Sequence, residues 1–239
     1  MTVYLVGTSG WHYEDWKGIF YPAGQPPARW LPFYAERFQT VELNYSFYQQ
    51  PTEKAYRDWA KNTPPGFKFA VKASRYITHI KKLRDPSGPL DKFFERAGLL
   101  GDKLGPVLYQ LPPQLKRSDD LLGSFLQALP KGVRHVFEFR HDSWFHQDVL
   151  RLLRKHKAGF CVMDMPGLTS PVAATASFAY VRFHGSQSLY SSLYSREEML
   201  DWAGKIKGLP KTVKTVYIYF NNDVAGYALE NARQLISLL

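Results

Sequence analysis

Ionisable and amide side chains recur in this sequence near the ends of short runs rich in aromatic and β-branched residues. They often occupy alternate positions, as Glu138 and Arg140 do around Phe139. Alternate residues of a β-strand share one face, so each run presents its polar side chains to one side. The side chains in this pattern are those of Glu42, Asn44, Lys72, Gln110, Glu138, Arg140, Asp164, Arg182, His184 and Asn221.

These residue types suit the binding of an anion and the transfer of protons. Lys72, Arg140 and Arg182 can hold a phosphate or a carboxylate through charge-assisted hydrogen bonds. Carboxylates can act as general acids or bases, and a histidine can shuttle protons. The predicted catalytic residues are therefore Glu42, Glu138, Asp164 and His184.

A purely structural role is the alternative for the same residues. Three carboxylates and three permanent cations could neutralise one another as a buried ion network that fills the core. We favour a ligand site because buried ion pairs are often no better than apolar packing. Buried ionisable groups in clefts are also enriched at functional sites. Some members, such as Glu138 with Arg140 or Arg182, could still support their neighbours.

Eight short segments have the composition of strands and would carry these side chains. Helical apolar stripes separate most of them, and the clearest helix opens with the capping box Ser195-x-x-Glu198 and closes at Gly208. Ser118 is a plausible N-cap of another helix, and the link 166–178 is not expected to form a regular helix. The predicted strands are Tyr4–Thr8, Thr40–Asn44, Phe67–Ala73, Val107–Leu111, His135–Arg140, Gly159–Asp164, Ala179–His184 and Thr215–Asn221.

Strands that alternate with helices indicate a parallel sheet. Eight such units without a linker predict one (β/α)8 TIM-barrel domain over residues 1–239, with a weak or missing helix between strands six and seven. An open doubly wound sheet is the alternative, but no glycine-rich nucleotide fingerprint follows an early strand. Since both faces of a barrel strand are normally apolar, the polar side chains should point into the mouth at the carboxyl ends of the strands.

Loops at the same end of the barrel add candidate ligand contacts. Ser9 and Trp11 follow the first strand, and Trp11 could stack on a ligand. Gly185, Ser186 and the pair Asn221–Asn222 follow the last two strands, where this fold often holds phosphate. Mere surface loops are the alternative. The predicted ligand-binding residues are Ser9, Trp11, Asn44, Lys72, Gln110, Arg140, Arg182, Gly185, Asn221 and Asn222.

Composition narrows the class of protein. The chain of 239 residues is 45% hydrophobic and 22% charged, as is usual for a globular domain. Its net charge of +10 is spread along the sequence, which favours a solvated basic surface over a nucleic-acid interface. The single cysteine, Cys161, excludes an intrachain disulfide and a cysteine-cluster zinc site.

The sequence predicts no bound cofactor and no membrane segment. No HxH or HExxH spacing indicates a metal ligand set, although a divalent metal stays open. The first residues show neither a basic leader nor a long apolar stretch, so a cytoplasmic protein is expected. The oligomeric state cannot be predicted.

Ordered motifs along the whole chain resemble those of the YecE-like family, a domain of unknown function (number 72). They include Gly7-Thr8-Ser9-Gly10-Trp11, Glu42-Leu43-Asn44-Tyr45-Ser46-Phe47-Tyr48, Phe69-Ala70-Val71-Lys72, Gln110-Leu111-Pro112-Pro113, Glu138-Phe139-Arg140-His141-Asp142-Ser143-Trp144, Arg182-Phe183-His184-Gly185 and Tyr219-Phe220-Asn221-Asn222. The resemblance implies a TIM barrel and brings no established reaction. Its motifs coincide with the predicted pocket.

Three functions follow as hypotheses. The first is an enzyme that acts by acid–base chemistry on a small polar substrate bearing phosphate or carboxylate. The second is a nucleic-acid binding or processing protein, which would resemble the endonuclease IV barrels in fold and basic charge only. The third is a non-catalytic ligand-binding protein. A serine or cysteine nucleophile is not expected, because no GxSxG turn is present and Cys161 lies within a strand.

Overall fold

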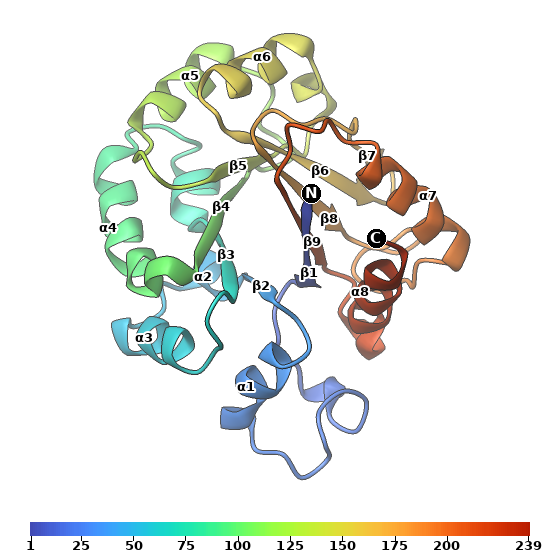
Figure 1. Cartoon of the computed structure of the whole chain (residues 1–239). Coiled ribbons are helices and arrows are strands. Elements are labelled where there is room, and N and C mark those ends of the chain that lie inside the picture. Colours follow the sequence, from blue (N-terminus) through green and yellow to red (C-terminus); the bar gives the residue numbers. More distant parts are fainter.

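Eight parallel strands form a nearly closed barrel in the computed structural model, which describes residues 1–239. The hydrogen-bonded order around the barrel is β1-β9-β8-β6-β5-β4-β3-β2, and a short β7 pairs antiparallel with β6. Figure 1 shows these strands at the centre of the molecule. The strands are β1 (Val3–Thr8), β2 (Thr40–Leu43), β3 (Lys68–Lys72), β4 (Leu104–Gln110), β5 (His135–Glu138), β6 (Gly159–Met165), β7 (Leu168–Thr169), β8 (Phe178–Phe183) and β9 (Thr215–Phe220).

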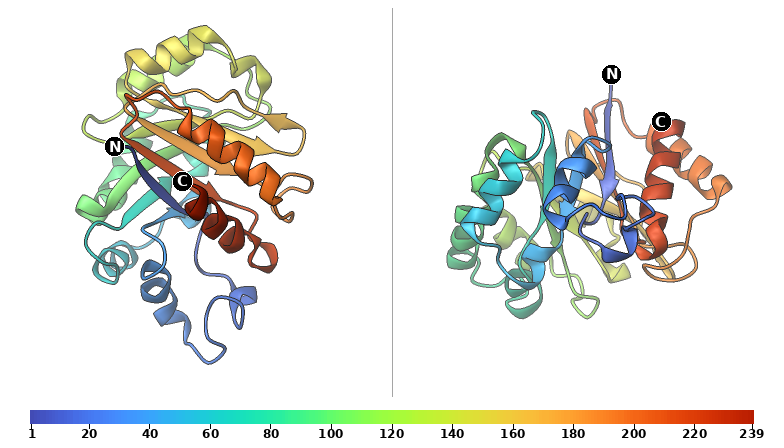
Figure 2. Two further views of the ribbon diagram at one scale, coloured as in Figure 1. Left: turned by 45° about the vertical axis from the view of Figure 1, so that its right-hand side comes forward. Right: turned by 90° about the horizontal axis from the view of Figure 1, so that it is seen from below.

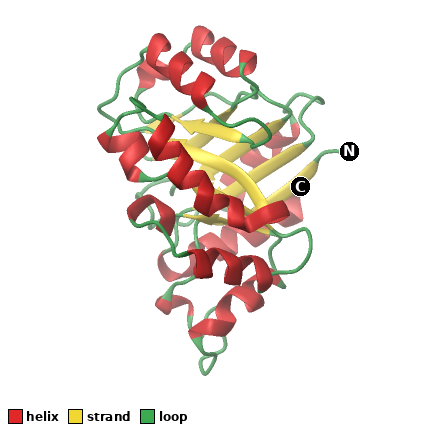
Figure 3. Ribbon diagram, turned by 90° about the vertical axis from the view of Figure 1, so that its left-hand side faces the viewer, coloured by secondary structure: helices red, strands yellow, loops and turns green.

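Helices lie outside the strands, as the red and yellow ribbons of Figure 3 show. Both chain ends lie at the amino ends of the strands, so the carboxyl ends are left to the connecting loops (Figure 2). No helix is long and apolar enough to cross a bilayer. The helices are α1 (Trp30–Ala35), α2 (Tyr45–Tyr48), α3 (Glu53–Lys61), α4 (Ser87–Ala97), α5 (Asp119–Ala128), α6 (Gln147–Lys155), α7 (Arg196–Lys207) and α8 (Tyr227–Leu238).

The predicted barrel is confirmed, and the predicted strands agree with the observed ones to within a few residues. No helix joins β6 to β8, as the sequence of 166–178 led us to expect, and the two-residue β7 lies in that link. The capping box of α7 is present, with Ser195 and Glu198 bonded to each other's backbone. Ser118 does occupy the N-cap of α5, but its side chain makes no capping hydrogen bond.

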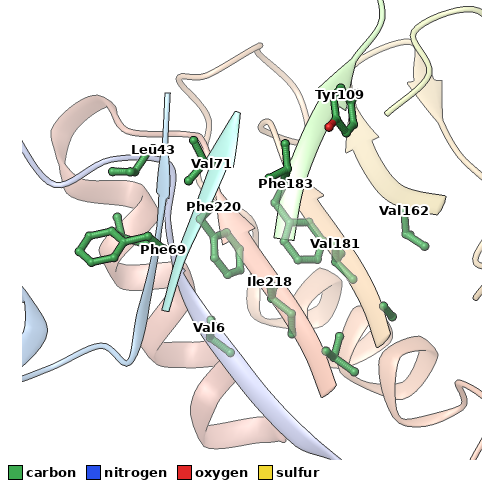
Figure 4. Packing of buried hydrophobic residues seen from close by; sticks show 14 of the residues in the cluster. Val6, Leu43, Phe69, Val71, Tyr109, Val162, Val181, Phe183, Ile218 and Phe220 are labelled. Carbon is green, nitrogen blue, oxygen red and sulfur yellow. The ribbon is translucent and has the colours of Figure 1, made fainter. Parts of the chain in front are cut away.

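The core consists of two separate apolar clusters, because alternate residues of each strand face the helices outside the barrel or its interior. Residues such as Val71, Val181 and Phe220 face outward and join the large cluster beneath the helices, part of which Figure 4 shows. Residues of the other parity, such as Ala70 and Tyr180, form a smaller cluster inside the barrel. The interior residues nearer the carboxyl ends are charged, which brings ionisable groups into a closed space.

The seam between β1 and β2 is closed by a side chain. These two strands share no paired register, and Tyr34 of α1 lies between them. Its hydroxyl accepts a hydrogen bond of 2.9 Å from the Thr8 amide and donates one of 3.1 Å to the Thr40 carbonyl. The strands approach closely here, since a Cβ on Gly7 would lie 2.2 Å from the Thr40 oxygen. Glycine is therefore required at this position.

Tyr34→Phe is expected to destabilise the protein by about 1–3 kcal/mol, because it leaves a buried amide and a buried carbonyl unpaired. Chemical denaturation measures this loss. Tyr56→Phe is the matched control, because Tyr56 is equally buried and its hydroxyl has no hydrogen-bond partner. That control should be neutral or slightly stabilising, and equal losses in the two variants would contradict the role given to Tyr34.

Candidate functional site

Arg182 of β8 is the centre of an ion network inside the barrel. Its guanidinium donates to Glu42 of β2 at 2.7 Å and to Glu138 of β5 at 2.5 Å. All three side chains are almost completely buried. Tyr180 and Ser9 donate further hydrogen bonds to Glu42, of 2.7 and 2.8 Å. The network thus ties together strands on opposite sides of the barrel.

The two carboxylates of the network are held in their charged form. Burial alone would raise the pKa of Glu42, but the Arg182 charge and the hydrogen bonds to the carboxylate hold it below the usual value. The same balance of burial against Arg140 and Arg182 holds the pKa of Glu138 well below its usual range. Arg140 donates to the second oxygen of Glu138. Both carboxylates are therefore satisfied within the protein.

His184 is a neutral and fully partnered histidine at the end of β8. Its Nε2 lies 3.0 Å from a guanidinium nitrogen of Arg140, which can only donate, so Nε2 accepts. The proton of the neutral ring is then on Nδ1, which faces the side-chain amide of Asn221 at 3.1 Å. Burial, with the charges of Arg182 and Arg140, lowers the pKa of His184 to about 3.

Lys72, at the end of β3, is the one cation of the interior without a carboxylate partner. Its ammonium forms no ion pair and no hydrogen bond, and Nζ lies 4.1 Å from the centre of the Phe47 ring. The residue is 8% exposed. Burial and then the Arg182 charge lower the pKa of Lys72 to about 7, against the opposing effect of Glu138 and Glu42.

Asp164 does not join this group, contrary to the prediction. Val162 belongs to the outer apolar cluster and Met163 to the inner one, so Asp164 has the outward parity. Its carboxylate accepts from Thr169 at 2.7 Å. Near the end of β6 it is Met165 that reaches the network, and its sulfur accepts from Arg140 at 2.9 Å.

Two other predicted ligand contacts are engaged elsewhere. Asn222 is fully buried, and its amide donates to Asn231 of α8 and to the Ser192 carbonyl, away from the mouth. The Gly185 amide donates a hydrogen bond of 3.1 Å to the Tyr194 hydroxyl and so is not free for a phosphate. Gln110 lies beside Glu138 in register and is partly exposed, with no partner for its amide.

A cavity of about 500 Å³ lies over the ends of β1 and β2, to one side of the network. Ser9, Glu42 and Asn44 reach it from the strand ends. Trp11 packs edge-on against Trp59, with ring centres 5.6 Å apart, in its wall. The cavity is mainly aromatic, and its aromatic lining residues are Trp11, Tyr13, Tyr45, Tyr48 and Trp59.

Sequence reasoning missed a buried carboxyl behind this cavity. Burial raises the pKa of Asp223 to about 8, against the opposing effect of the nearby Tyr13 hydroxyl. Its Oδ1 is buried and unpaired. Asp223 lies just beyond β9, outside the strand pattern, and no feature of the sequence sets it apart from other loop carboxylates. Tyr180 was also missed, because an aromatic residue within a strand looks like ordinary core.

The structure groups no three histidine, cysteine, aspartate or glutamate side chains in a way that could hold a metal ion. Cys161 lies inside the barrel with its sulfur 3.9 Å from Glu138. Burial raises the pKa of its thiol well above the usual value, so it stays protonated.

Comparison with known proteins agrees with this architecture. UPF0759 protein YunF of Bacillus subtilis (strain 168) is 26% identical to the chain, over 98% of this chain and 94% of its own length. The crystal structure of a DUF72 family protein from Thermotoga maritima matches with a TM-score of 0.90 and 33% identity, over 99% of this chain and 98% of that one.

A second crystal structure, of a DUF72 family protein from Enterococcus faecalis, matches with a TM-score of 0.86 and 20% identity, over 99% of this chain and 95% of that one. At that identity the likeness shows the fold alone. The family model described as "Protein of unknown function DUF72" matches residues 5–239. The chain therefore belongs to the DUF72 family, as its motifs led us to expect.

Proposed function

We propose that the protein is an enzyme that binds a small molecule bearing a phosphate or carboxylate at the barrel mouth and transfers a proton through Lys72. The observation that carries this proposal is the unpaired ammonium of Lys72 among buried charges. Lys72, Arg140 and Arg182 face two charged carboxylates in the interior, those of Glu42 and Glu138. The buried carboxyl of Asp223, with its pKa raised to about 8, is mostly protonated at neutral pH. The cluster therefore has one positive charge in excess when Lys72 is protonated.

An anionic ligand would neutralise that excess charge. The two interior carboxylates are already held by the arginines, so neither can pair with Lys72 without losing a bond of 2.5 to 2.7 Å. A phosphate or carboxylate at the mouth could accept from Lys72 directly, and a charge-assisted hydrogen bond in a buried site is strong. The partly exposed amides of Gln110 and Asn221 are further donors at the same end of the barrel.

Lys72 also has the pKa that proton transfer at neutral pH requires, since an acid or base works best when its pKa is near the working pH. The lowered pKa values keep Glu42 and Glu138 charged and His184 neutral throughout this range. We therefore assign to these three residues the support of Lys72 and of the ligand, in place of the acid–base roles first considered for them.

The aromatic cavity beside the network would hold the rest of the molecule. Aromatic faces such as those of Trp11 and Tyr48 bind the apolar face of a sugar or a planar group, while Glu42 and Asn44 provide polar contacts at its base. We further propose that the protein works in a reducing compartment such as the cytoplasm, which the single buried cysteine supports.

A thermal-shift screen tests the proposal. The panel contains phosphosugars, sugar acids and nucleotides, with short DNA and RNA as a separate arm. A small anion present at about 100 times its Kd should stabilise the wild type by about 2.7 kcal/mol. Lys72→Met should abolish the stabilisation.

Lys68→Met is the matched control, because Lys68 lies on the same strand with the same parity but at the other end, bonded to the Asp102 carbonyl. It should respond like the wild type. Small anions that stabilise all three proteins equally would contradict the assigned site. Stabilisation by oligonucleotides alone, lost on addition of salt, would favour the nucleic-acid hypothesis instead.

A further inference from the structure

We infer that Lys72 is a nucleophilic amine that forms an imine with the substrate, which makes the substrate class an aldehyde or ketone bearing a carboxylate or phosphate. This inference rests on the proposed function and extends it, because anion binding and proton transfer require no carbonyl group. It is carried by the position of the amine, by the absence of a partner and by the charges around it.

The ammonium group of Lys72 differs from those of other partly buried lysines in having no hydrogen-bond partner. Lys68 and Lys103 donate to backbone carbonyls and are thereby held. Lys72, although the most buried of the three, makes no hydrogen bond and rests against the Phe47 ring. A lysine that served only to balance charge would lie against Glu42 or Glu138, and both are instead bonded to Arg182. The free ammonium is thus left for something that enters the mouth.

The backbone beneath the amine is rigid. The Lys72 carbonyl accepts from the Ser46 hydroxyl at 2.7 Å, and the next amide, that of Ala73, donates to Leu108 of β4 at 2.8 Å. The Phe47 ring covers one side of the ammonium. A reactive group on a fixed strand end, with one side covered, meets a bound carbonyl carbon from a defined direction.

Burial and the charges of Arg182 and Arg140 favour the uncharged, nucleophilic form of the amine, against the opposing effect of the two glutamates. Glu42 of β2, Glu138 and Arg140 of β5, Arg182 of β8 and His79 of the β3–α4 connection are the ionisable groups that act on it. A desolvated lysine beside other cations is one of the recognised forms of activated amine. Burial and this neighbourhood bring the pKa of Lys72 to about 7, so a large share is uncharged at neutral pH.

The step balances without an oxidant or reductant. The nitrogen lone pair forms a bond to the carbonyl carbon, and the oxygen takes up a proton to give a carbinolamine. The carbon–oxygen bond then breaks, and the oxygen leaves as water with both hydrogens of the amine. Protonation of the imine nitrogen places one positive charge where the ammonium was, so the anionic group of the substrate still meets the same excess charge.

Reductive trapping tests the inference. The full chain is incubated with glyoxylate or dihydroxyacetone phosphate and sodium borohydride, and the labelled peptide is identified by mass spectrometry. Glycolaldehyde and dihydroxyacetone are the matched uncharged carbonyl probes. With at least one anionic probe, Lys72 should be labelled roughly 10- to 100-fold faster than any other lysine, because its uncharged fraction is much larger. The glyoxylate and phosphate arms tell a carboxylate site from a phosphate site.

Lys72→Arg, which keeps the charge, should lose the label, and Lys68→Met should keep it. Labelling spread over surface lysines at equal rates would overturn the inference. If the non-carbonyl anions lactate and glycerol phosphate bind in a Lys72-dependent way and no probe labels Lys72, the imine is excluded and the proposed anion site stands. If uncharged probes label Lys72 as fast as anionic ones, the amine is reactive and the anion site is wrong.

Discussion

Arg182→Met should destabilise the protein by about 3–5 kcal/mol, because it leaves a buried carboxylate without its cation. Glu138 would retain Arg140, but Glu42 would retain only the hydroxyls of Tyr180 and Ser9 as direct partners. This loss is a large part of the 5–15 kcal/mol that typically stabilises a folded domain. Chemical denaturation at neutral pH measures it.

A second change in the same variant tests the cause. Glu42→Gln removes the uncompensated charge, so the double variant should be more stable than Arg182→Met alone. Arg117→Met is the matched control, since Arg117 also joins two carboxylates, those of Asp119 and Asp148, but at the surface. Its effect should be much smaller. A loss in the control equal to that in Arg182→Met would mean that burial of the network is energetically irrelevant.

Lys72 should make the stability of the wild type rise with pH above neutrality. In the unfolded chain its pKa takes the ordinary value of 10.5, whereas in the folded protein it is about 7. Between these values the unfolded chain binds one more proton than the folded protein. The free energy of unfolding therefore increases by up to about 1.4 kcal/mol per pH unit from this group alone. Below pH 7 both states carry the proton and the contribution is flat.

Comparison of variants isolates that contribution from the other titrating groups. Urea denaturation of the wild type, Lys72→Met and Lys68→Met is measured from pH 6 to pH 9.5. The wild type should gain stability relative to Lys72→Met by roughly 2–3 kcal/mol between pH 7 and pH 9. Lys68→Met should follow the wild type. Parallel curves for all three proteins would show that Lys72 titrates with an ordinary pKa.

Much of the fold could be predicted because each strand has a strong local signal. Segments such as Val107–Leu111 and Thr215–Asn221 are short, apolar and separated by helical stripes, and these are the features that distinguish a parallel barrel. The strand β7 was not predicted, because Leu168–Thr169 is too short to show a periodic pattern. The open pairing between β1 and β2 has no sequence signal, since it depends on how the Tyr34 side chain packs from the helix that connects the two strands.

The candidate site was predicted in part. Parity correctly grouped Glu42, Glu138 and Arg182, because charged residues stand out on strands whose other positions are apolar. It failed for Asp164, because β6 is apolar on both faces and its neighbours Met163 and Met165 do not reveal which face is interior. That the Lys72 ammonium would lack a carboxylate partner could not be predicted either. It depends on how two carboxylates are shared among three cations, which only the three-dimensional arrangement decides.

The hydroxyl of Tyr34 bears on the motion of the barrel. Every other neighbouring pair of barrel strands is joined by a backbone ladder, whereas β1 and β2 are held together through a few side chains, those of Tyr34, Ser9 and Asn44. Transient opening will therefore concentrate at this seam, and amide hydrogen exchange will be fastest there among the strands. Ser9 and Glu42, at the ends of these two strands, line the aromatic cavity. A molecule bound in that cavity would contact the ends of both strands. Binding would therefore favour the closed form of the barrel, and the closed form would bind more tightly.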